Sequence, residues 1–291
     1  MAFDNAYEAI TEDNSARWAF GTGFDDPLSG VDTTIPEGVE PGALAAYCLM
    51  LGDDALVFSH RLQQWCTRAP ELEDEVALAN IGLDLLGQAR LLLARAGHAE
   101  GGGRGEDHYA FFRDAHEFRN VGLAELERGD FGRLTAALLV FTTWRLALFQ
   151  RLTSSRDPVL AAIAAKGVKE LTYHRDYAAR WAVRLGDGTE FSRERLLAGL
   201  AAVHPHVGEL FTPHEVESRL AAAGIGVDPA GVRAEFDDVL VQVCAAATLP
   251  APGPPPAVPG STGRDGAHTP ALVELLAEMQ GVARADPEAT W

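Results

Sequence analysis

A glutamate and a histidine lie one helical turn apart in the segment "KELTYHRDYAARW", residues 169–181. Some four-helix bundles bind two iron ions in their cores, where two helices each supply one Glu and the other two each supply a Glu-x-x-His pair. Glu170 and His174 are four residues apart rather than three, and Leu171 stands where this motif has its Glu. The segment therefore predicts either a shifted iron site or a site that has lost ligands.

The second helix that the sequence predicts, residues 71–97, contains the comparable stretch "LDLLGQAR", residues 83–90. It has Leu85 at the Glu position and Gln88 at the His position, so three of the four paired ligands are missing. Leucine has no donor atom, and an amide oxygen is a weak iron ligand. The helices expected to supply one Glu each, through "ALVFSHRL" and "LLVFTTWRLALF", contain none. A working site would have to be rebuilt from Asp54, Asp84, Glu170 and His174.

The same polar residues allow two interpretations without metal. Asn80, Asp84 and Gln88 recur every four residues on one helix, as do Glu170 and His174 on another. Buried polar groups need hydrogen-bond partners, and Asp–His and Gln–carboxylate pairs can supply them. The residues can therefore form a polar core where a metal once bound. Alternatively, Asp84 and Glu170 face solvent.

Other groups of reactive side chains give weaker patterns. His204, His206 and His214 lack a common helix or strand spacing, so we interpret them as a surface cluster. The glycine-rich "GGGRGED" precedes no strand, which argues against a phosphate-binding loop. The three cysteines have no C-x-x-C spacing and are expected to be buried free thiols. They are Cys48, Cys66 and Cys244.

Composition excludes several classes of partner. The 291 residues are 47% apolar and carry a formal net charge of −18. Nucleic acids and anionic membranes select basic surfaces, so neither is expected as a partner. The acidic N-terminus does not resemble a secretory signal, and we find no uninterrupted run of about 18 apolar residues. We therefore expect a cytoplasmic protein.

Helical periodicity dominates the chain and predicts an all-α fold. Long helices are expected over 42–66, 71–97, 131–152 and 158–185, followed by shorter ones over 192–209, 213–223, 229–247 and 269–283. On the second helix, alternating steps of four and three residues predict a stripe that faces the bundle core. This stripe is Leu72, Val76, Ala79, Leu83 and Leu86.

Four regions follow from composition. Residues 1–40 form an acidic, irregular extension with nine acids and one base, which supplies −8 of the net charge of −18. A helical domain occupies 41–248, and a proline-rich connector occupies 249–267. Residues 268–291 are expected to form a helix and tail that pack back on the bundle.

Several of these segments together resemble one known family. They are "AYCLMLGDDALVFSHRLQQWC", "APELEDEVALANIGLDLLGQAR" and "SRDPVLAAIAAKGVKELTYHRDYAARWAVRLGDGT", with "LLAEMQ" and a final Trp near the end. The chain is similar, from about Gly42 to Trp291, to the structural subunits of the ring-1,2-phenylacetyl-CoA epoxidases. The acidic segment 1–40 and the proline-rich segment 250–260 depart from the shorter family pattern.

This resemblance implies a ferritin-like four-helix bundle with additional C-terminal helices. It also implies a place in a multicomponent monooxygenase of aerobic phenylacetate degradation. In that system a homologous catalytic subunit carries the di-iron centre and epoxidises phenylacetyl-CoA, with electrons from a separate reductase. The present chain would have no metal or cofactor of its own and would pair with the catalytic subunit and stabilise it.

The resemblance further implies two segments in contact with the acyl-CoA, "HEFRN" and "VESRL". The implied residues are Glu117, Phe118, Arg119, Asn120, Ser218, Arg219 and Leu220. Guanidinium groups suit CoA phosphates, so the two arginines would carry the contact. Two rival hypotheses remain open, a self-sufficient di-iron enzyme that uses Asp84, Glu170 and His174, and a helical interaction protein unrelated to phenylacetate.

Overall fold

The structure is a computed structural model that describes residues 28, 30–127, 129–258 and 260–288. Most of the expected acidic extension, residues 1–27 and 29, lies outside the described residues. The described part of the chain is helical and contains no strand, which confirms the all-α fold class. In chain order the α-helices are α2 (Pro41–Gln63), α3 (Leu72–Glu100), α4 (Glu106–Phe111), α5 (Phe131–Leu152), α6 (Pro158–Gly186), α7 (Glu190–Val207), α8 (Glu215–Ala222), α9 (Arg233–Ala246) and α10 (Pro270–Ala285).

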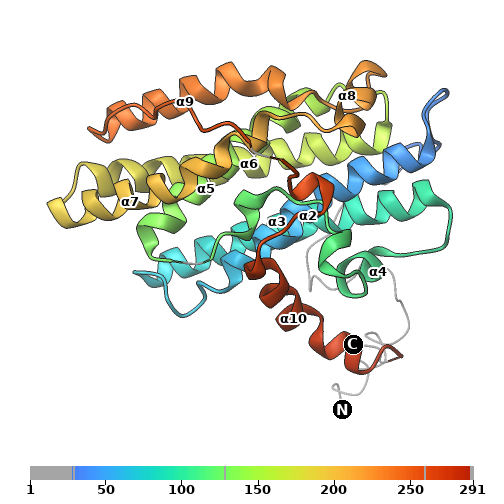
Figure 1. Ribbon diagram of the computed structural model, residues 1–291, viewed down its shortest axis with the longest axis horizontal. Helices are drawn as coiled ribbons and strands as arrows, with labels where there is room; N and C mark the ends of the chain where they lie inside the picture. Colours follow the sequence, from blue (N-terminus) through green and yellow to red (C-terminus); the bar gives the residue numbers. More distant parts are fainter. Residues whose placement is uncertain (1–27, 29, 128, 259, 289–291) are drawn as a thin grey trace, which may run out of the picture.

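Two long helical hairpins form the bundle, α2 with α3 and α5 with α6, and α3 packs on α6. Local sequence sets the helix ends. Asp157 caps α6 by accepting a hydrogen bond from the Leu160 amide at 2.9 Å, and Pro158 occupies the first helical position. After α3, Gly101 has a φ of +71°, a left-handed conformation that disfavours residues with a Cβ atom. Figure 1 shows α9 and α10 at opposite edges of the bundle.

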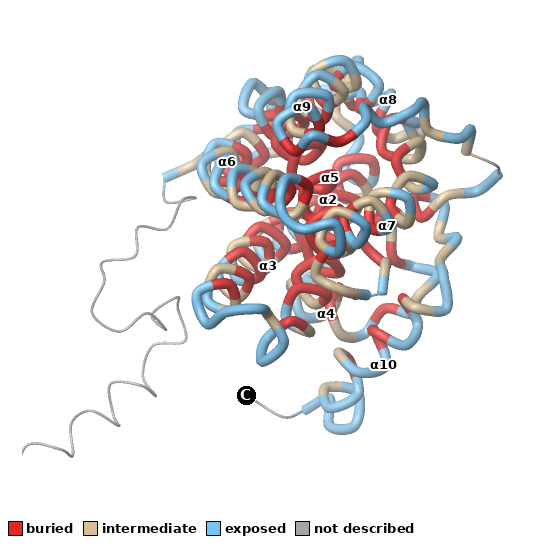
Figure 2. The backbone as a smooth tube through the Cα atoms, turned by 90° about the vertical axis from the view of Figure 1, so that its left-hand side faces the viewer, coloured by how far each residue is buried: buried red, intermediate tan, exposed pale blue. Residues whose placement is uncertain are grey.

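The central helices α2 and α5 are buried around most of their circumference, as Figure 2 shows. By length and composition alone, α2, α3 and α5 are long and apolar enough to cross a membrane. The search of the sequence for an uninterrupted apolar run had not identified them. In the most apolar 18-residue stretch of each helix, 83% of the residues of α2 and 89% of those of α5 are buried inside the protein. Their apolar character is thus used in the bundle core.

One predicted stripe on α3 is wrong. Leu72, Val76 and Leu83 were expected in the core, but they are 70%, 54% and 49% exposed. We call these three residues the α3 outer stripe. The face of α3 that packs into the core carries Leu78, Ile81, Leu85 and Leu92, each at most 1% exposed. Because α3 is apolar on most sides, it has two stripes of helical period, and the period alone does not select between them.

The C-terminal segment completes the core rather than merely covering it. Arg264, in the turn η5 (Gly263–Asp265), is 4% exposed and donates to both carboxylate oxygens of Asp54, at 3.0 and 2.9 Å. Gln280 of α10 donates to the carbonyl oxygens of Ala110, in α4, and Arg113, just after it, both at 3.0 Å. Residues 263–285 therefore tie the connection between α3 and α5 onto α2.

A buried histidine and glutamate join the same two segments. The Nδ1 atom of His268 lies 2.6 Å from Glu125 Oε1, and its Nε2 atom lies 2.9 Å from the Phe118 carbonyl oxygen. Both partners accept hydrogen bonds, so both ring nitrogens must donate and the imidazole is cationic. Burial alone would lower the pKa of His268, but the bonds to Glu125 and Phe118 outweigh it and raise that pKa above 6.5.

This pair predicts a pH-dependent stability. Burial raises the pKa of Glu125, but the bonds from His268 and Thr269 outweigh it and lower that pKa below 4.5. The contribution of Glu125 to the free energy of unfolding is therefore complete above pH 4.5. The contribution of His268 is complete below pH 6.5 and is lost as the pH rises through its raised pKa. In urea denaturation, we expect the stability difference between the wild type and His268→Gln to narrow above pH 6.5. A constant difference up to pH 9 would contradict an imidazolium at this position.

Candidate functional site

The four positions that correspond to the paired iron ligands are all buried in the bundle. Leu85 and Gln88 on α3 are 0% and 1% exposed, and Leu171 and His174 on α6 are both 0% exposed. Sequence spacing therefore placed these residues on the correct faces. Two of them, however, end in methyl groups that cannot bind a metal.

Two hydrogen bonds connect α3 and α6 at this level. His174 Nε2 lies 2.9 Å from Asp84 Oδ2, and Gln88 Nε2 donates to Glu170 Oε2 at 2.9 Å. The Asp84 side chain retains 40% exposure, and that of Glu170, which also pairs with Lys166, retains 14%. The polar pairs therefore run from the core to the edge of the helix interface. Asn80, expected in the same polar core, is exposed on α3 and does not belong to it.

A buried arginine lies at the centre of the bundle, and sequence reasoning missed it. Arg145 on α5 is 0% exposed and donates from Nε to Gln88 Oε1 at 3.0 Å and from Nη1 to the Leu51 carbonyl oxygen at 3.1 Å. Its guanidinium carbon lies 4.4 Å from the centroid of the Phe149 ring, a cation–π contact. Burial lowers the pKa of Arg145 to about 10, so it remains cationic at neutral pH.

The signal for Arg145 was present in "LLVFTTWRLALF", where it is the only charged residue of an otherwise uncharged helical stretch. A single charge within such a stretch must be placed in the core or near an acceptor. The di-iron pattern calls for a Glu on this helix, and so it gives no reason to expect a buried cation there.

These residues do not fit a di-iron site. The site would need carboxylates and imidazoles from four helices, but α3 and α6 place Leu85 and Leu171 at the Glu positions. A divalent cation beside Gln88 would also meet the positive charge of Arg145. Within the described residues, no group of three or more His, Cys, Asp and Glu side chains is placed to hold a metal ion.

The alternative ligand Asp54 has other partners. It is 0% exposed, both carboxylate oxygens accept from Arg264, and Oδ1 also accepts from the Val121 amide at 2.8 Å. The neighbouring Asp53 pairs with Arg113 and accepts from the Arg119 amide at 2.8 Å. Both carboxylates of α2 are therefore bound by arginines, one from the connection between α3 and α5 and one from η5. The sequence offered Asp54 only as a candidate ligand of a rebuilt iron site, and these ion pairs were missed.

The first segment expected to contact CoA is largely an internal turn. Phe118 and Asn120 are 0% exposed, and Asn120 donates to Glu125 Oε1 at 2.9 Å. The Arg119 guanidinium donates to the carbonyl oxygens of His116 and Phe118, both at 2.7 Å. Glu117 is exposed and caps η1 (Ala115–Glu117). In this structure, the Arg119 guanidinium is therefore bound to backbone carbonyl oxygens.

The second segment lies on α8. Ser218 is exposed, Arg219 pairs with Glu40 at 3.3 Å, and Leu220 is 2% exposed and belongs to the core. Both segments meet at Arg264, which donates to the Arg119 carbonyl oxygen at 2.6 Å and lies 3.7 Å from Glu217 Oε1. The structure therefore brings the two segments together around a buried cation, but Phe118, Asn120 and Leu220 have no side-chain surface for a ligand.

The remaining candidate residues are separate. His204 contacts the Gly253 carbonyl oxygen at 3.2 Å, whereas His214 caps α8, so these two do not share a ligand. Cys48 and Cys244 are buried free thiols as expected, but the expectation was wrong for Cys66, which is exposed. Cys66 donates to the side chain of Gln63 at 3.4 Å.

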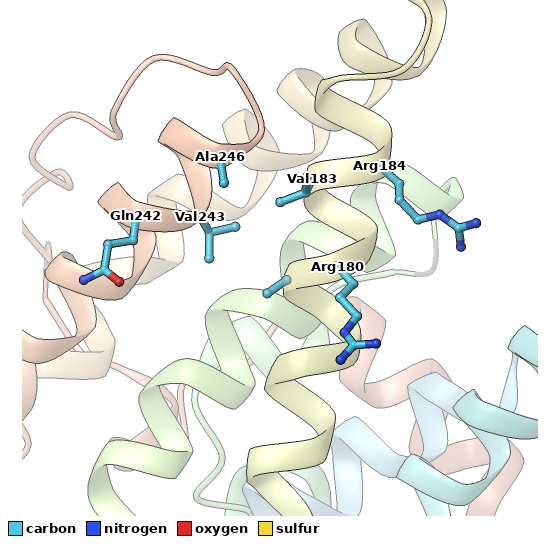
Figure 3. A pocket seen from close by; sticks show the side chains of 7 residues that line it. Arg180, Val183, Arg184, Gln242, Val243 and Ala246 are labelled. Atoms are coloured by element: carbon cyan, nitrogen blue, oxygen red, sulfur yellow. The ribbon is translucent and has the colours of Figure 1, made fainter.

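An open hollow of about 610 Å³ lies between α6 and α9, and its lining includes Val183, Arg184 and Val243. Figure 3 shows the side chains of Arg180 and Arg184 directed away from α9, on the far side of α6. Arg180 pairs with Asp176 at 2.9 Å, and Arg184 lies over the Trp181 ring at 4.7 Å. The residues that line the hollow therefore offer neither a general base nor a nucleophile.

Comparison with known proteins gives two matches. The family model described as phenylacetic acid catabolic protein matches residues 32–291. A curated relative from Escherichia coli strain K12, the C subunit of a 1,2-phenylacetyl-CoA epoxidase, is 43% identical over 248 residues. This alignment covers 85% of the present chain and 99% of the relative.

Proposed function

Because the chain belongs to the phenylacetic acid catabolic protein family, we propose that it is a non-catalytic, structural subunit of a phenylacetyl-CoA epoxidase complex. The observation that supports the structural role most directly is the centre of the bundle. There, Leu85 and Leu171 stand at ligand positions, and the guanidinium of Arg145 binds Gln88. A bundle built in this way can position a partner but lacks the donor atoms for oxygen activation.

The proposed partner is a homologous catalytic subunit that carries the di-iron centre, supplied with electrons by a reductase subunit. The relative is itself named as one lettered component of an epoxidase, which implies an assembly of several chains. We place this assembly in the cytoplasm. In this proposal, contact with the acyl-CoA falls to the exposed members of the two segments, Glu117, Ser218 and Arg219.

The α3 outer stripe is the proposed face for the catalytic subunit. With Ala79 and Leu86, it continues the alternating steps of four and three residues that are typical of a seam between two helices. Tyr173 of α6 is 54% exposed and precedes His174 in the sequence. The ring of His174 binds Asp84, which follows Leu83 of the stripe, so α6 adds an aromatic side chain near this face. An exposed seam of this kind in a member of a multisubunit family fits a helix of another subunit.

Iron content distinguishes the structural role from a self-sufficient enzyme. After anaerobic loading with Fe(II) and desalting, we expect the purified chain to retain less than roughly 0.1 iron per chain, against about two for a di-iron bundle. Elemental analysis measures this directly. Glu170→Ala and His174→Ala serve as matched variants, because the rival hypothesis uses both residues as ligands.

Two results would overturn the proposal. Retention of about two iron ions, lost in both variants, would make the chain an oxygen-activating enzyme in its own right. Failure to co-purify with the cognate catalytic subunit would instead favour a helical interaction protein of another pathway.

A further inference from the structure

A small cavity lies where α2 ends and α5 begins. Its volume is about 20 Å³, above the roughly 10–15 Å³ that one water molecule needs. The polar residues of its lining come from three segments. They are Arg61 in the last turn of α2 and Trp65 just after it, Glu127 in the connection, and Arg133 in the first turn of α5. The rest of the lining is apolar, with Phe58, Leu62, Leu126, Leu134 and Ala137.

Three of the residues around this cavity have a buried N–H group without a hydrogen-bond partner. These groups are Arg61 Nε, Trp65 Nε1 and Arg133 Nε. Arg61 and Trp65 are only 8% and 5% exposed. A buried donor without a partner is unfavourable, so three such donors around one cavity favour an occupant that accepts hydrogen bonds.

The position of Arg61 is fixed by its other nitrogen atoms. Its Nη2 donates to the carbonyl oxygens of Glu125 and Ala271, both at 2.9 Å, and Nη1 donates to Gln64 Oε1 at 3.3 Å. The guanidinium is therefore held in place before any ligand binds, and only Nε is left without a partner. The site is thus preorganised on the side of α2.

The donor set defines the chemistry of the occupant. Indole and guanidinium nitrogens donate and do not accept hydrogen bonds. A water molecule accepts about two hydrogen bonds and needs acceptors for its own protons, whereas a halide ion can accept all three. The first turn of α5 adds the positive end of a helix dipole, which the capping carboxylate of Asp130 partly offsets. Of the charged groups that line the cavity, Glu127 opposes an anion, whereas Arg61 and Arg133 favour it. Glu125, Glu274 and Glu278 also act on Arg61 electrostatically and oppose an anion.

We propose that this cavity is a binding site for one monatomic anion of the size of chloride. The ion would accept hydrogen bonds from Arg61, Trp65 and Arg133 and so join the end of α2 to the start of α5. A volume of about 20 Å³ suits a monatomic ion better than sulfate or phosphate. The site lies apart from the α3 outer stripe and from Arg145, so the proposal is independent of the proposed function.

Thermal unfolding of the full chain in chloride tests the site. Sodium chloride replaces sodium gluconate at constant ionic strength, so that general screening is unchanged. We expect a saturable rise in melting temperature, of about 2–4 °C once chloride exceeds its dissociation constant roughly tenfold. Bromide should act in the same way, and sulfate at equal ionic strength should not.

Two variants assign the effect to the cavity. Trp65→Phe removes one donor and keeps an aromatic ring, so the chloride-dependent rise should shrink or disappear. Glu127→Gln removes the opposing charge, so half-saturation should move to a lower chloride concentration. Equal melting temperatures in chloride and gluconate, or an unchanged chloride response in Trp65→Phe, would overturn the proposal and leave a water molecule as the occupant.

Discussion

Replacement of Arg264 by methionine is expected to lower the free energy of unfolding by about 3–5 kcal/mol, because it leaves a buried carboxylate without its counter-ion. Asp54 is 0% exposed, and Arg264 supplies two of the hydrogen bonds to it. Burial alone would lower the pKa of Arg264, but Asp54 and Glu217 outweigh it and raise that pKa, so Arg264 is cationic. Urea denaturation at pH 7 measures the loss.

A surface ion pair provides the control for this experiment. Arg180 and Asp176 are 2.9 Å apart, with side chains 76% and 54% exposed, so Arg180→Met should change the stability by less than about 1 kcal/mol. The double variant Asp54→Asn with Arg264→Met should lose less stability than the sum of the losses in the two single variants. Each substitution removes the charge that the other one would leave without a counter-ion. Strict additivity would show that the two side chains do not interact as described.

Glutamates in the α3 outer stripe are expected to reduce the affinity for the catalytic subunit by about 100-fold or more. Leu72→Glu and Leu83→Glu together would place two charges in an apolar interface, and 100-fold corresponds to about 2.7 kcal/mol. Both residues are about half or more exposed, so the fold itself should be unaffected. Isothermal calorimetry with the purified catalytic subunit measures the affinity, and melting temperatures verify the fold.

Exposed valines elsewhere provide matched controls for the stripe. Val241 on α9 is 49% exposed and Val282 on α10 is 63% exposed. Val241→Glu and Val282→Glu each replace exposed apolar area by a negative charge, as the substitutions in the α3 outer stripe do. We expect both variants to bind the catalytic subunit with the affinity of the wild type. If the stripe variant binds like the wild type while Val241→Glu does not, the partner face lies on α9 instead.

The helices were predictable because each has a long run of apolar period and clear end signals. Pro158 and its capping Asp157 marked the start of α6, which was expected at 158–185 and spans Pro158–Gly186. The inward positions of Leu85, Gln88, Leu171 and His174 followed from their spacing and hold in the structure. Where one stripe dominates a helix, period and burial agree.

The failures share one physical cause, because periodicity does not identify the neighbours of a helix. On α3 two apolar stripes compete, and the one with more regular spacing is exposed. Asn80 was assigned inward from its spacing to Asp84. Each step of four residues, however, turns about 40° around the helix axis, and Asn80 lies past the edge of the interface. The partners of Asp54 and Asp53 lie outside the bundle helices, in stretches without helical period, so nothing in the sequence of α2 pointed to them.

The pairing of Asp54 with Arg264 also bears on the order in which the protein is made. The two residues are 210 positions apart, and synthesis proceeds from the N-terminus, so the carboxylates of α2 exist long before the arginine that neutralises Asp54. Helices α2 to α9 can assemble their apolar contacts during that interval. The charge at the centre of α2 is balanced only after the proline-rich connector and η5 have emerged, which makes completion of the core a late event.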